Sequence, residues 1–254
     1  MPTSSFRETS PDPHAPGPPP RGLVIRQTED RDLDALEALS RRVYPTEAPW
    51  SRTYLEAHRA RFPAGQLVAL RTDPEGGAAQ VVGMAASLRL PPSMAAGDAP
   101  YAEVTGDFRF EVHDPEGPTL YAAEVMVDPA ARRQGIGAAL YAARRELARA
   151  EGVERIRAAA RLPGYGAHAA EMSLGDYVDA VLRRELHDAT LTFQLDQGFR
   201  VVQPLGRYFT GRDRESQGYA VLIEWTPPET DVAEEGVMSD PSVPSTPGGH
   251  GMAP

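Results

Sequence analysis

The feature that most constrains this chain is a turn with two glycines between an apolar strand and a helix. The strand pattern covers Thr119–Val127 and is the strongest in the sequence. It continues into "VDPAARRQGIGAALYAARRELARAEG", which runs from Val127 to Gly152. There, apolar residues recur at three- and four-residue spacing from Ile136 to Leu147, and Gly152 suits the end of a helix. Such a turn often binds phosphate, because the amides at a helix N-terminus are free and glycine lets a ligand approach.

Four interpretations compete for this turn. A dinucleotide fingerprint, G-x-G-x-x-G, needs a third glycine where Leu140 stands, and its acidic ribose partner is misplaced because Glu154 begins a strand. A phosphate loop needs a lysine, and all 26 basic residues are arginines, so that loop is excluded. The turn could also be a strand–helix corner that binds nothing. Finally, Arg132, Gly135 and Gly137 fit the pattern [QR]-x-x-G-x-[GA] directly after the strand.

That last pattern resembles the acyl-CoA-binding motif of the GNAT superfamily of N-acyltransferases, and the resemblance covers about residues 23–225. The stretch "GYGAHAAEMSLGDYVDAVLRRELHDATLTFQLDQGF", followed by "ESQGYAVLIEW", is similar to acetyltransferase modules joined to nitrilase-type carbon–nitrogen hydrolases. The hydrolase is absent here, and its cysteine nucleophile has no counterpart because the chain has no cysteine. The resemblance implies an α+β fold with a mixed, mostly antiparallel sheet and helices on both faces.

The two ends of the chain differ from its middle. Residues 1–20 hold seven of the 25 prolines, and residues 226–254 hold six more. These stretches have few large apolar side chains, so they cannot bury enough surface to offset chain entropy. The C-terminal stretch also carries five acidic residues and no arginine, half of the net charge of −10. We therefore expect a disordered proline-rich segment over 1–22, an acyltransferase domain over 23–226 and a disordered acidic tail over 227–254.

Composition also limits the partners. The middle of the chain is only mildly acidic, which argues against nucleic acid. No apolar run approaches the roughly 18 residues of a membrane span, and the N-terminus lacks the apolar core of a secretory signal. The absence of cysteine excludes thiolate metal sites and fits a reducing compartment. From composition we expect a cytoplasmic protein without a metal. The resemblance implies acetyl-CoA and an unidentified amine as partners and allows a homodimer.

Periodicity predicts most of the remaining elements. Residues 91–118 are rich in proline, glycine and aspartate and are predicted to be a functional excursion. In "LTFQLDQGF" alternation favours a strand, whereas Asp188 and Gly198 would suit the two ends of a helix, which is what the resemblance implies. The other expected elements are strands at Leu23–Gln27, Gln66–Arg71, Val81–Leu90, Glu154–Arg161, Phe199–Pro204 and Tyr219–Trp225, a helix over Leu33–Val43 capped by Thr28 or Asp30, and helices at Ser51–Phe62 and after Ser173.

The resemblance also assigns CoA binding to named residues. The backbone of the strand end is implied to pair with the pantetheine amides and to stabilise the oxyanion formed on the thioester. Amides from Gln134 to Ala138 are implied to hold the pyrophosphate, and an arginine adds a charge-assisted contact. The implied set is Val125, Met126, Val127, Arg132, Arg133, Gln134, Gly135, Ile136, Gly137 and Ala138.

Glu124 is the first candidate for the catalytic base. An attacking ammonium must lose a proton, and Glu124 is a carboxylate within an otherwise apolar strand, one residue off the Val125 face. The alternative is a structural glutamate in a salt bridge. Glu103, Glu111 and His113 in the 91–118 excursion are further candidates.

The general acid departs from the family pattern. The family's usual tyrosine lies in the helix before the "GF" pair, and this position holds Gln194, which cannot donate a proton to a leaving thiolate. Either His187, Tyr208 or Tyr165 substitutes, or the thiolate leaves unaided. The expected function is transfer of an acetyl group from acetyl-CoA to a primary amine by direct attack. The alternative is a CoA-binding regulatory or partner module without turnover.

Overall fold

One seven-stranded sheet organises the part of the chain that the structure describes. The structure is a computed structural model, and it describes residues 20–228 except 47, 73–76, 97–98, 207, 210–212 and 214. The strand order is β1-β2-β3-β4-β5-β7-β6, and all neighbours are antiparallel except the parallel pair β4 and β5. The strands are β1 (Leu23–Gln27), β2 (Gln66–Arg71), β3 (Gln80–Leu90), β4 (Thr119–Val127), β5 (Arg155–Arg161), β6 (Arg200–Leu205) and β7 (Ala220–Trp225). The mixed, mostly antiparallel sheet expected from the sequence is confirmed.

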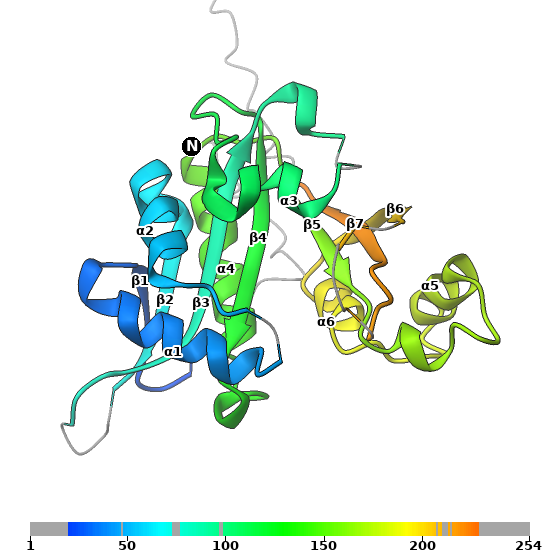
Figure 1. Ribbon diagram of the computed structural model, residues 1–254, viewed down its shortest axis with the longest axis horizontal. Helices are drawn as coiled ribbons and strands as arrows, with labels where there is room; N and C mark the ends of the chain where they lie inside the picture. The colour runs from blue at the N-terminus through cyan, green and yellow to red at the C-terminus, as the bar shows by residue number, and fades with distance from the viewer. Residues whose placement is uncertain are drawn as a thin grey trace, which may run out of the picture.

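Helices cover both faces of this sheet. Figure 1 shows α1 (Leu33–Val43) and α2 (Arg52–Arg61) in front of the strands and α4 (Ile136–Ala150) behind them. The buried leucines of α1 join one core cluster with β3 and β4, whereas α4, α5 (Leu174–Leu182) and α6 (Leu191–Asp196) share another. The shorter elements are η1 (Asp30–Asp32), η2 (Pro63–Gly65), η3 (Pro92–Met94), α3 (Tyr101–Val104), η4 (Gly106–Phe110), η5 (Pro129–Ala131) and η6 (Tyr165–Ala167).

The strands β4 and β5 pair at their beginnings and then separate. Their Cα partners run from Thr119 with Arg155 to Tyr121 with Arg157. Beyond this point the two strands diverge (Figure 1), while β4 stays paired with β3 as far as Val127. The later half of β4 therefore has one edge that is not paired with a neighbouring strand, and we call the gap between β4 and β5 the opening.

A β-bulge lies at the start of this opening. The register between β3 and β4 shifts between Ala86 and Ser87, which pair with Glu124 and Ala122, so Ala123 is an extra residue in β4. After the bulge, the Glu124 side chain lies on the face covered by α1, where it meets the connection between α1 and α2. The bulge thus directs an acidic side chain towards one side of the opening.

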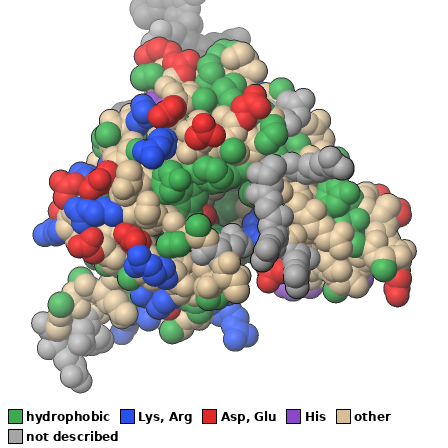
Figure 2. Space-filling model, in the orientation of Figure 1, with side chains coloured by type: hydrophobic (Ala, Val, Ile, Leu, Met, Phe, Trp, Pro, Cys, Tyr) green, Lys and Arg blue, Asp and Glu red, His purple; other side chains and the backbone are tan. Residues whose placement is uncertain are grey.

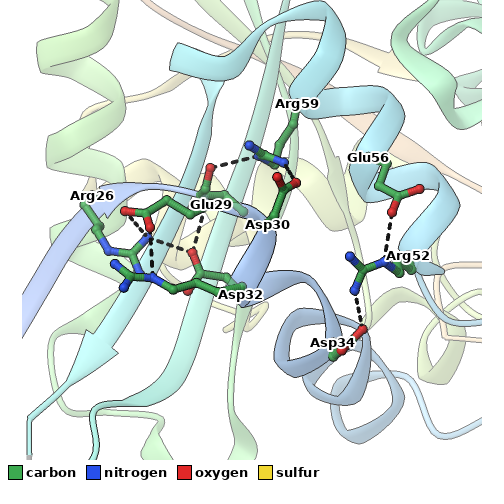
Figure 3. A network of polar contacts seen from close by, with 10 residues as sticks. Arg26, Glu29, Asp30, Asp32, Asp34, Arg52, Glu56 and Arg59 are labelled. Atoms are coloured by element: carbon green, nitrogen blue, oxygen red, sulfur yellow. Dashed lines mark hydrogen bonds and ion pairs between the residues drawn. The ribbon is translucent and has the colours of Figure 1, made fainter.

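A surface network of arginines and carboxylates ties α2 to the chain that leads into α1 (Figure 3). Arg26 forms a two-pronged pair with Asp32, with Nη1–Oδ2 and Nη2–Oδ1 distances of 2.7 and 2.8 Å. From α2, Arg52 reaches Asp34 in α1, and Arg59 reaches Asp30 and the carbonyl of Thr28. Each exposed pair contributes little alone, but together they join both ends of α2 to the start of α1 and to the residues before it.

Most predicted elements agree with the structure. One prediction, the cap of α1, is wrong, and one open alternative, the conformation of "LTFQLDQGF", is decided. The α1 helix is not capped by Thr28 or Asp30: its N-cap is Asp32, and the preceding turn η1 begins after Glu29, whose amide donates to the carboxylate of Asp32 at 2.8 Å. "LTFQLDQGF" forms the helix that the resemblance implied, because Asp188 accepts hydrogen bonds from the first amides of α6 and Gly198 takes a left-handed conformation after it. The predicted disordered ends lie outside the described residues, apart from residues 20–22 and 227–228.

Candidate active site

The glycine turn presents a group of backbone amides at the start of α4. Gly135 is the N-cap with φ +77°, a left-handed conformation that favours glycine. The first bond within the helix joins the Ala139 amide to the Gly135 carbonyl at 3.0 Å. The amides of Ile136, Gly137 and Ala138 precede that bond, so the helix itself offers them no acceptor. This arrangement is suited to an anion.

Polar side chains surround the same turn. Arg132, Arg133 and Gln134 are exposed, and Arg133 has a φ of +58°, which is uncommon outside glycine. Gln134 accepts a hydrogen bond from Arg71 of β2 at 2.6 Å, and the Arg132 Nε lies 3.4 Å from the Val127 carbonyl. Three arginines therefore stand at the mouth of the turn, and one of them, Arg71, is contributed by a strand far away in sequence.

The strand end leads from this turn to Glu124. Met126 is fully buried, whereas Val125 and Val127 are partly exposed. Asp128 ends the strand by accepting the Ala130 amide at 3.0 Å, which turns the chain into η5. The opening beside β4 and the amide group at α4 are therefore two ends of one continuous stretch of backbone.

The Glu124 carboxylate is partly buried and accepts three hydrogen bonds. Oε1 accepts from the Tyr44 hydroxyl and the Val125 amide, both at 3.0 Å, and Oε2 accepts from the Trp50 indole at 3.0 Å. Burial raises the pKa of Glu124 above its usual value, although these bonds and the charge of Arg161 act in the opposite direction. A carboxylate oxygen can accept about two hydrogen bonds, so Oε2 keeps one free position. A carboxylate with these properties can accept a proton.

Tyr208 lies on the same side of the sheet as Glu124. Its hydroxyl is hydrogen-bonded to that of Tyr121, its side chain is buried, and burial raises its pKa well above the usual range. Tyr101 connects the two groups, because its hydroxyl donates to the carbonyl of Ala123 at 3.1 Å and its ring lies 6.2 Å from that of Tyr208. The candidate base and this candidate acid therefore lie around one buried tyrosine.

The other candidate acids lie elsewhere. His187 is exposed in the connection between α5 and α6, while its neighbour Asp188 is buried. Tyr165 is buried against Tyr177 and Tyr219. Neither side chain has a recorded contact with Glu124 in the part of the chain that the structure describes.

The further base candidates are either exposed at the surface or held in packing contacts. Glu103 and Glu111 are exposed, and Glu111 lies 3.5 Å from Arg61. His113 accepts the Arg89 amide through Nδ1 at 3.0 Å and stacks on Phe62 with ring centroids 4.7 Å apart. Burial lowers the pKa of His113.

Gln194 lies in a buried polar group behind the opening. Its amide nitrogen donates to the Tyr141 hydroxyl at 2.9 Å. The guanidinium carbon of Arg144 lies 5.4 Å from the ring centre of Tyr141, and its Nη2 donates to the Glu124 carbonyl at 2.7 Å. Arg144 Nη1 and Gln194 Oε1 are buried and have no hydrogen-bond partner among the described residues. Burial lowers the pKa of Arg144.

Several of these functional neighbours escaped sequence reasoning. Tyr44 and Trp50 flank a proline-containing connection, Tyr101 begins a four-residue helix, and Arg71 and Arg144 belong to ordinary amphipathic patterns. These five residues come from five separate segments of the chain. Their local sequence patterns therefore could not indicate that they belong to one site. The described residues contain no group of three His, Asp or Glu side chains that could hold a metal. Among the helices described, none is long and apolar enough to cross a membrane.

Comparison with known proteins decides the family. The model of the family described as "Acetyltransferase (GNAT) family" matches residues 33–172. The chain belongs to this family. The match includes β4, the glycine turn and α4, so the turn lies within the part of the chain that matches the family.

Two relatives from Bacillus subtilis (strain 168) extend the match beyond the family segment. "Uncharacterized N-acetyltransferase YkwB" is 30% identical over 207 residues, which cover 80% of this chain and 88% of that protein. "Probable hydrolase YhcX" is 35% identical over 203 residues, which cover 80% of this chain but only 38% of that protein. The second relative agrees with the resemblance to modules joined to a hydrolase.

Solved structures support the same fold. The "GphF GNAT-like decarboxylase in complex with isobutyryl-CoA" is 28% identical with a TM-score of 0.63, covering 80% of this chain and 98% of that one. The loading GNATL domain of CurA from Lyngbya majuscula is 20% identical with a TM-score of 0.66, covering 80% of this chain and 97% of that one, and this likeness concerns the fold alone. Acyl transfer is the reaction class indicated by the descriptions of the matched family and of YkwB.

Proposed function

We propose that this GNAT domain binds acetyl-CoA and transfers its acetyl group to a primary amine by direct attack. The observation that carries this proposal is the position of the Glu124 carboxylate, which is anchored by Tyr44 and Trp50 beside the opening between β4 and β5. The amide group of the glycine turn lies at the other end of the same strand. A thioester held along β4 would have an anion site at one end and a base at the other.

The residues at hand fit a CoA molecule. The amides of Gln134–Ala138 and the arginines Arg132 and Arg133 match the two negative charges of a pyrophosphate. The backbone of Val125–Val127 matches the amides of a pantetheine arm, because this edge of β4 has separated from β5. A Cβ at Gly137 would lie 3.2 Å from the Phe193 ring, so glycine also permits the close packing of α6 against this turn.

The proposed chemistry needs one proton transfer before or during attack. The acceptor loses a proton from its ammonium to Glu124, directly or through water, and its nitrogen attacks the thioester carbonyl carbon. Backbone amides of β4 stabilise the oxyanion. The attacking nitrogen then loses its second proton and the C–S bond breaks, so that the acetyl group remains on nitrogen as a neutral amide and the thiolate takes a proton. Tyr208 and His187 remain candidates for that acid, alongside departure of the thiolate unaided.

A screen for CoA release from acetyl-CoA across small amines tests this proposal. The chain has no cysteine, so a thiol-reactive dye reports CoA without background from the protein. Turnover with at least one primary amine, and none with its N-acetylated form, is the expected result. Tight CoA binding without release for any amine would contradict transfer and favour the CoA-binding module without turnover, which the replacement of the usual tyrosine by Gln194 also allows.

A second candidate function comes from the likeness to the GNAT-like decarboxylase. In such a reaction a carboxylated acyl-CoA loses CO₂, and the carbanion that remains takes a proton to give the shorter acyl-CoA. The unpaired Nη1 of the buried Arg144 supports this alternative, since a buried guanidinium attracts a carboxylate. Incubation with malonyl-CoA in the absence of amine separates the two: formation of acetyl-CoA supports decarboxylation, and recovery of intact malonyl-CoA excludes it for this substrate.

A further inference from the structure

Five aromatic side chains form a wall beside Glu124. They come from separate parts of the chain: the connection before α2, α2 itself, α3, η4 and the segment after β6. The ring of Phe108 lies 6.1 Å from Trp50, 6.3 Å from Tyr54 and 5.7 Å from Tyr101. Tyr101 also lies 5.5 Å from Phe209. We call these five residues (Trp50, Tyr54, Tyr101, Phe108 and Phe209) the aromatic wall.

Most of the aromatic wall is reached by solvent. Phe108 is 37% exposed, Trp50, Tyr54 and Phe209 are partly exposed, and Tyr101 is buried behind them. Figure 2 shows hydrophobic side chains gathered around a hollow in the middle of this face, in front of the region of β4 in Figure 1. The rings of Trp50, Tyr54 and Phe108 lie next to one another and remain partly exposed, and an apolar surface with a few polar groups is typical of a small-molecule site.

Part of the wall is built on strained backbone that is anchored by His58. Asp107, Phe108 and Phe110 have φ values of +49°, +64° and +59°, in the left-handed region that side-chain-bearing residues rarely adopt. The Phe108 carbonyl is bonded to Nε2 of His58 at 2.8 Å, and the His58 ring stacks on Phe110 with centroids 3.7 Å apart. Burial lowers the pKa of His58 to about 4, so this anchor is neutral at physiological pH. Three unfavourable conformations in one short segment indicate that the presentation of Phe108 is specified.

The wall and the carboxylate share a residue. Trp50 contributes its ring to the wall and its indole N–H to Glu124, so the free position on Oε2 lies next to an aromatic face. The basic groups on this side are already engaged: Arg161 pairs with Asp213 at 2.8 Å and lies over Phe209, and Arg109 lies over Tyr54. A ligand here meets a carboxylate at one end and flat apolar surfaces along its length.

We propose that the acceptor is a small primary amine carried on an aromatic ring by a short alkyl chain, an arylalkylamine, rather than a polyamine or a polar amino alcohol. This inference rests on the proposed function, because it names the acceptor of the same site. The ammonium faces Glu124 and gives up its proton there, while the ring packs against Phe108 and Trp50. Ring pairs of this kind contribute roughly 0.5–1.5 kcal/mol beyond the area that they bury.

The test compares primary amines that differ in the group attached to the amine. CoA release is measured with phenethylamine, 2-cyclohexylethylamine, butylamine, ethanolamine and spermidine at saturating acetyl-CoA. Phenethylamine is expected to have the highest kcat/KM, about tenfold or more above butylamine. Turnover that is equal for all, or highest for spermidine or ethanolamine, overturns the arylalkylamine proposal and leaves acetyl transfer standing. Absence of turnover with every amine contradicts the proposed function itself.

Variants locate the preference in the wall. Phe108→Ala should lower kcat/KM for phenethylamine about tenfold and lower that for butylamine by a clearly smaller factor, because a butyl chain covers less of the ring. Tyr54→Leu, on regular helix α2, repeats the test outside the strained segment in case Phe108→Ala fails to fold. Leu182→Ala removes a similarly exposed apolar side chain from α5 and should leave kcat/KM unchanged for both amines. An equal loss for both amines in Tyr54→Leu would overturn the role of the wall.

Discussion

The indole Nε1 of Trp50 donates a hydrogen bond to Oε2 of Glu124 across 3.0 Å, although 74 residues separate them in the chain. The bond joins a helix connection on one face of the sheet to the bulged strand β4. It fixes one carboxylate oxygen, while the Tyr44 hydroxyl and the Val125 amide occupy the other. The position and the proton affinity of the candidate base are therefore set by residues outside β4.

Removing the indole donor should shift the pH dependence of the reaction. The Trp50 and Tyr44 bonds lower the pKa of Glu124 against the raising effect of burial, so Trp50→Phe should raise that pKa further. Since the base acts when ionised, kcat/KM should fall most at acidic pH, by about tenfold or more for a bond worth roughly 1.5–3 kcal/mol to a charged group. At alkaline pH the variant should approach wild type.

A pH profile of kcat/KM for wild type, Trp50→Phe and Tyr44→Phe is the measurement. Tyr44→Phe removes the other side-chain donor and should displace the acidic limb in the same direction. Uniform loss at every pH in both variants would mean that the bonds serve folding rather than the ionisation of Glu124.

CoA should stabilise the folded protein. Only the folded chain presents the amide group at the start of α4, so CoA at 100 times its Kd should add about 2.7 kcal/mol to the free energy of unfolding. Thermal unfolding with CoA, NAD and ATP provides the measurement. A rise in Tm with CoA and none with NAD or ATP is expected, and an unchanged Tm at millimolar CoA would contradict the assignment of the turn.

Gly135→Val should abolish that stabilisation. A side chain there would block ligand approach, meets Pro20 Cγ at 3.2 Å and is strained at φ +77°, at a cost of about 1–2 kcal/mol or more for a branched residue. Gly152→Val is a matched control at the other end of α4, because Gly152 is also left-handed, with φ +61° and no atom within 4 Å of an added Cβ. Both variants should lose stability, and only Gly135→Val should lose the response to CoA. Equal responses would indicate a strand–helix corner without a ligand.

The arginines at the mouth of the turn should contribute to affinity separately. Arg132→Ala should weaken CoA binding about tenfold to a hundredfold, the usual range for a hydrogen bond to a charged group. Arg71→Ala should weaken it by a smaller factor, because Arg71 bonds to Gln134 and acts through its position and charge. Arg183→Ala, exposed beyond α5, is the control. Titration calorimetry at two salt concentrations checks this, since an ionic contribution shrinks as salt rises.

The sequence predicted those parts of the site that lie in one local stretch. The run from Glu124 to Ala138 contains the strand end, the turn and the start of the helix, and each has its own pattern of apolar spacing and glycine. Asp188 and Gly198 likewise mark the start and the end of the short helix α6, even though alternation across only nine residues favoured a strand.

What the sequence could not supply depends on contacts between distant segments. Tyr44 and Trp50 reach Glu124 only because α1 packs across β3 and β4 and the connection after α1 passes beside Glu124, and the bulge at Ala123 that turns Glu124 towards them has no local signature. Composition predicted that residues 91–118 form a functional excursion. It could not predict the three left-handed residues, Asp107, Phe108 and Phe110, that determine how the Phe108 ring is presented. The cap of η1 at Glu29 was missed because glutamate is not among the residues that usually precede a helix.

The decisive prediction separates Glu124 as a base from Glu124 as a structural anchor. The variant Glu124→Gln cannot keep all of these hydrogen bonds, because both carboxylate oxygens accept and the amide nitrogen of glutamine cannot accept from the Trp50 indole. The single variant would lose the base and also bring two donors together. Loss of activity in it would therefore have two explanations.

The double variant Glu124→Gln with Trp50→Phe removes the clash, because the remaining glutamine oxygen can still accept from Tyr44 and the Val125 amide. If Glu124 is the base, Trp50→Phe alone keeps substantial turnover at alkaline pH. The double variant then melts near the temperature of that single variant, binds CoA with unchanged Kd and turns over about 100-fold or more slowly. Its deficit should shrink as pH rises, because more of the amine is already neutral. If Glu124 is a structural anchor, the double variant recovers the rate of Trp50→Phe. Tm, Kd for CoA and kcat measured on wild type, the two single variants and the double variant distinguish these outcomes.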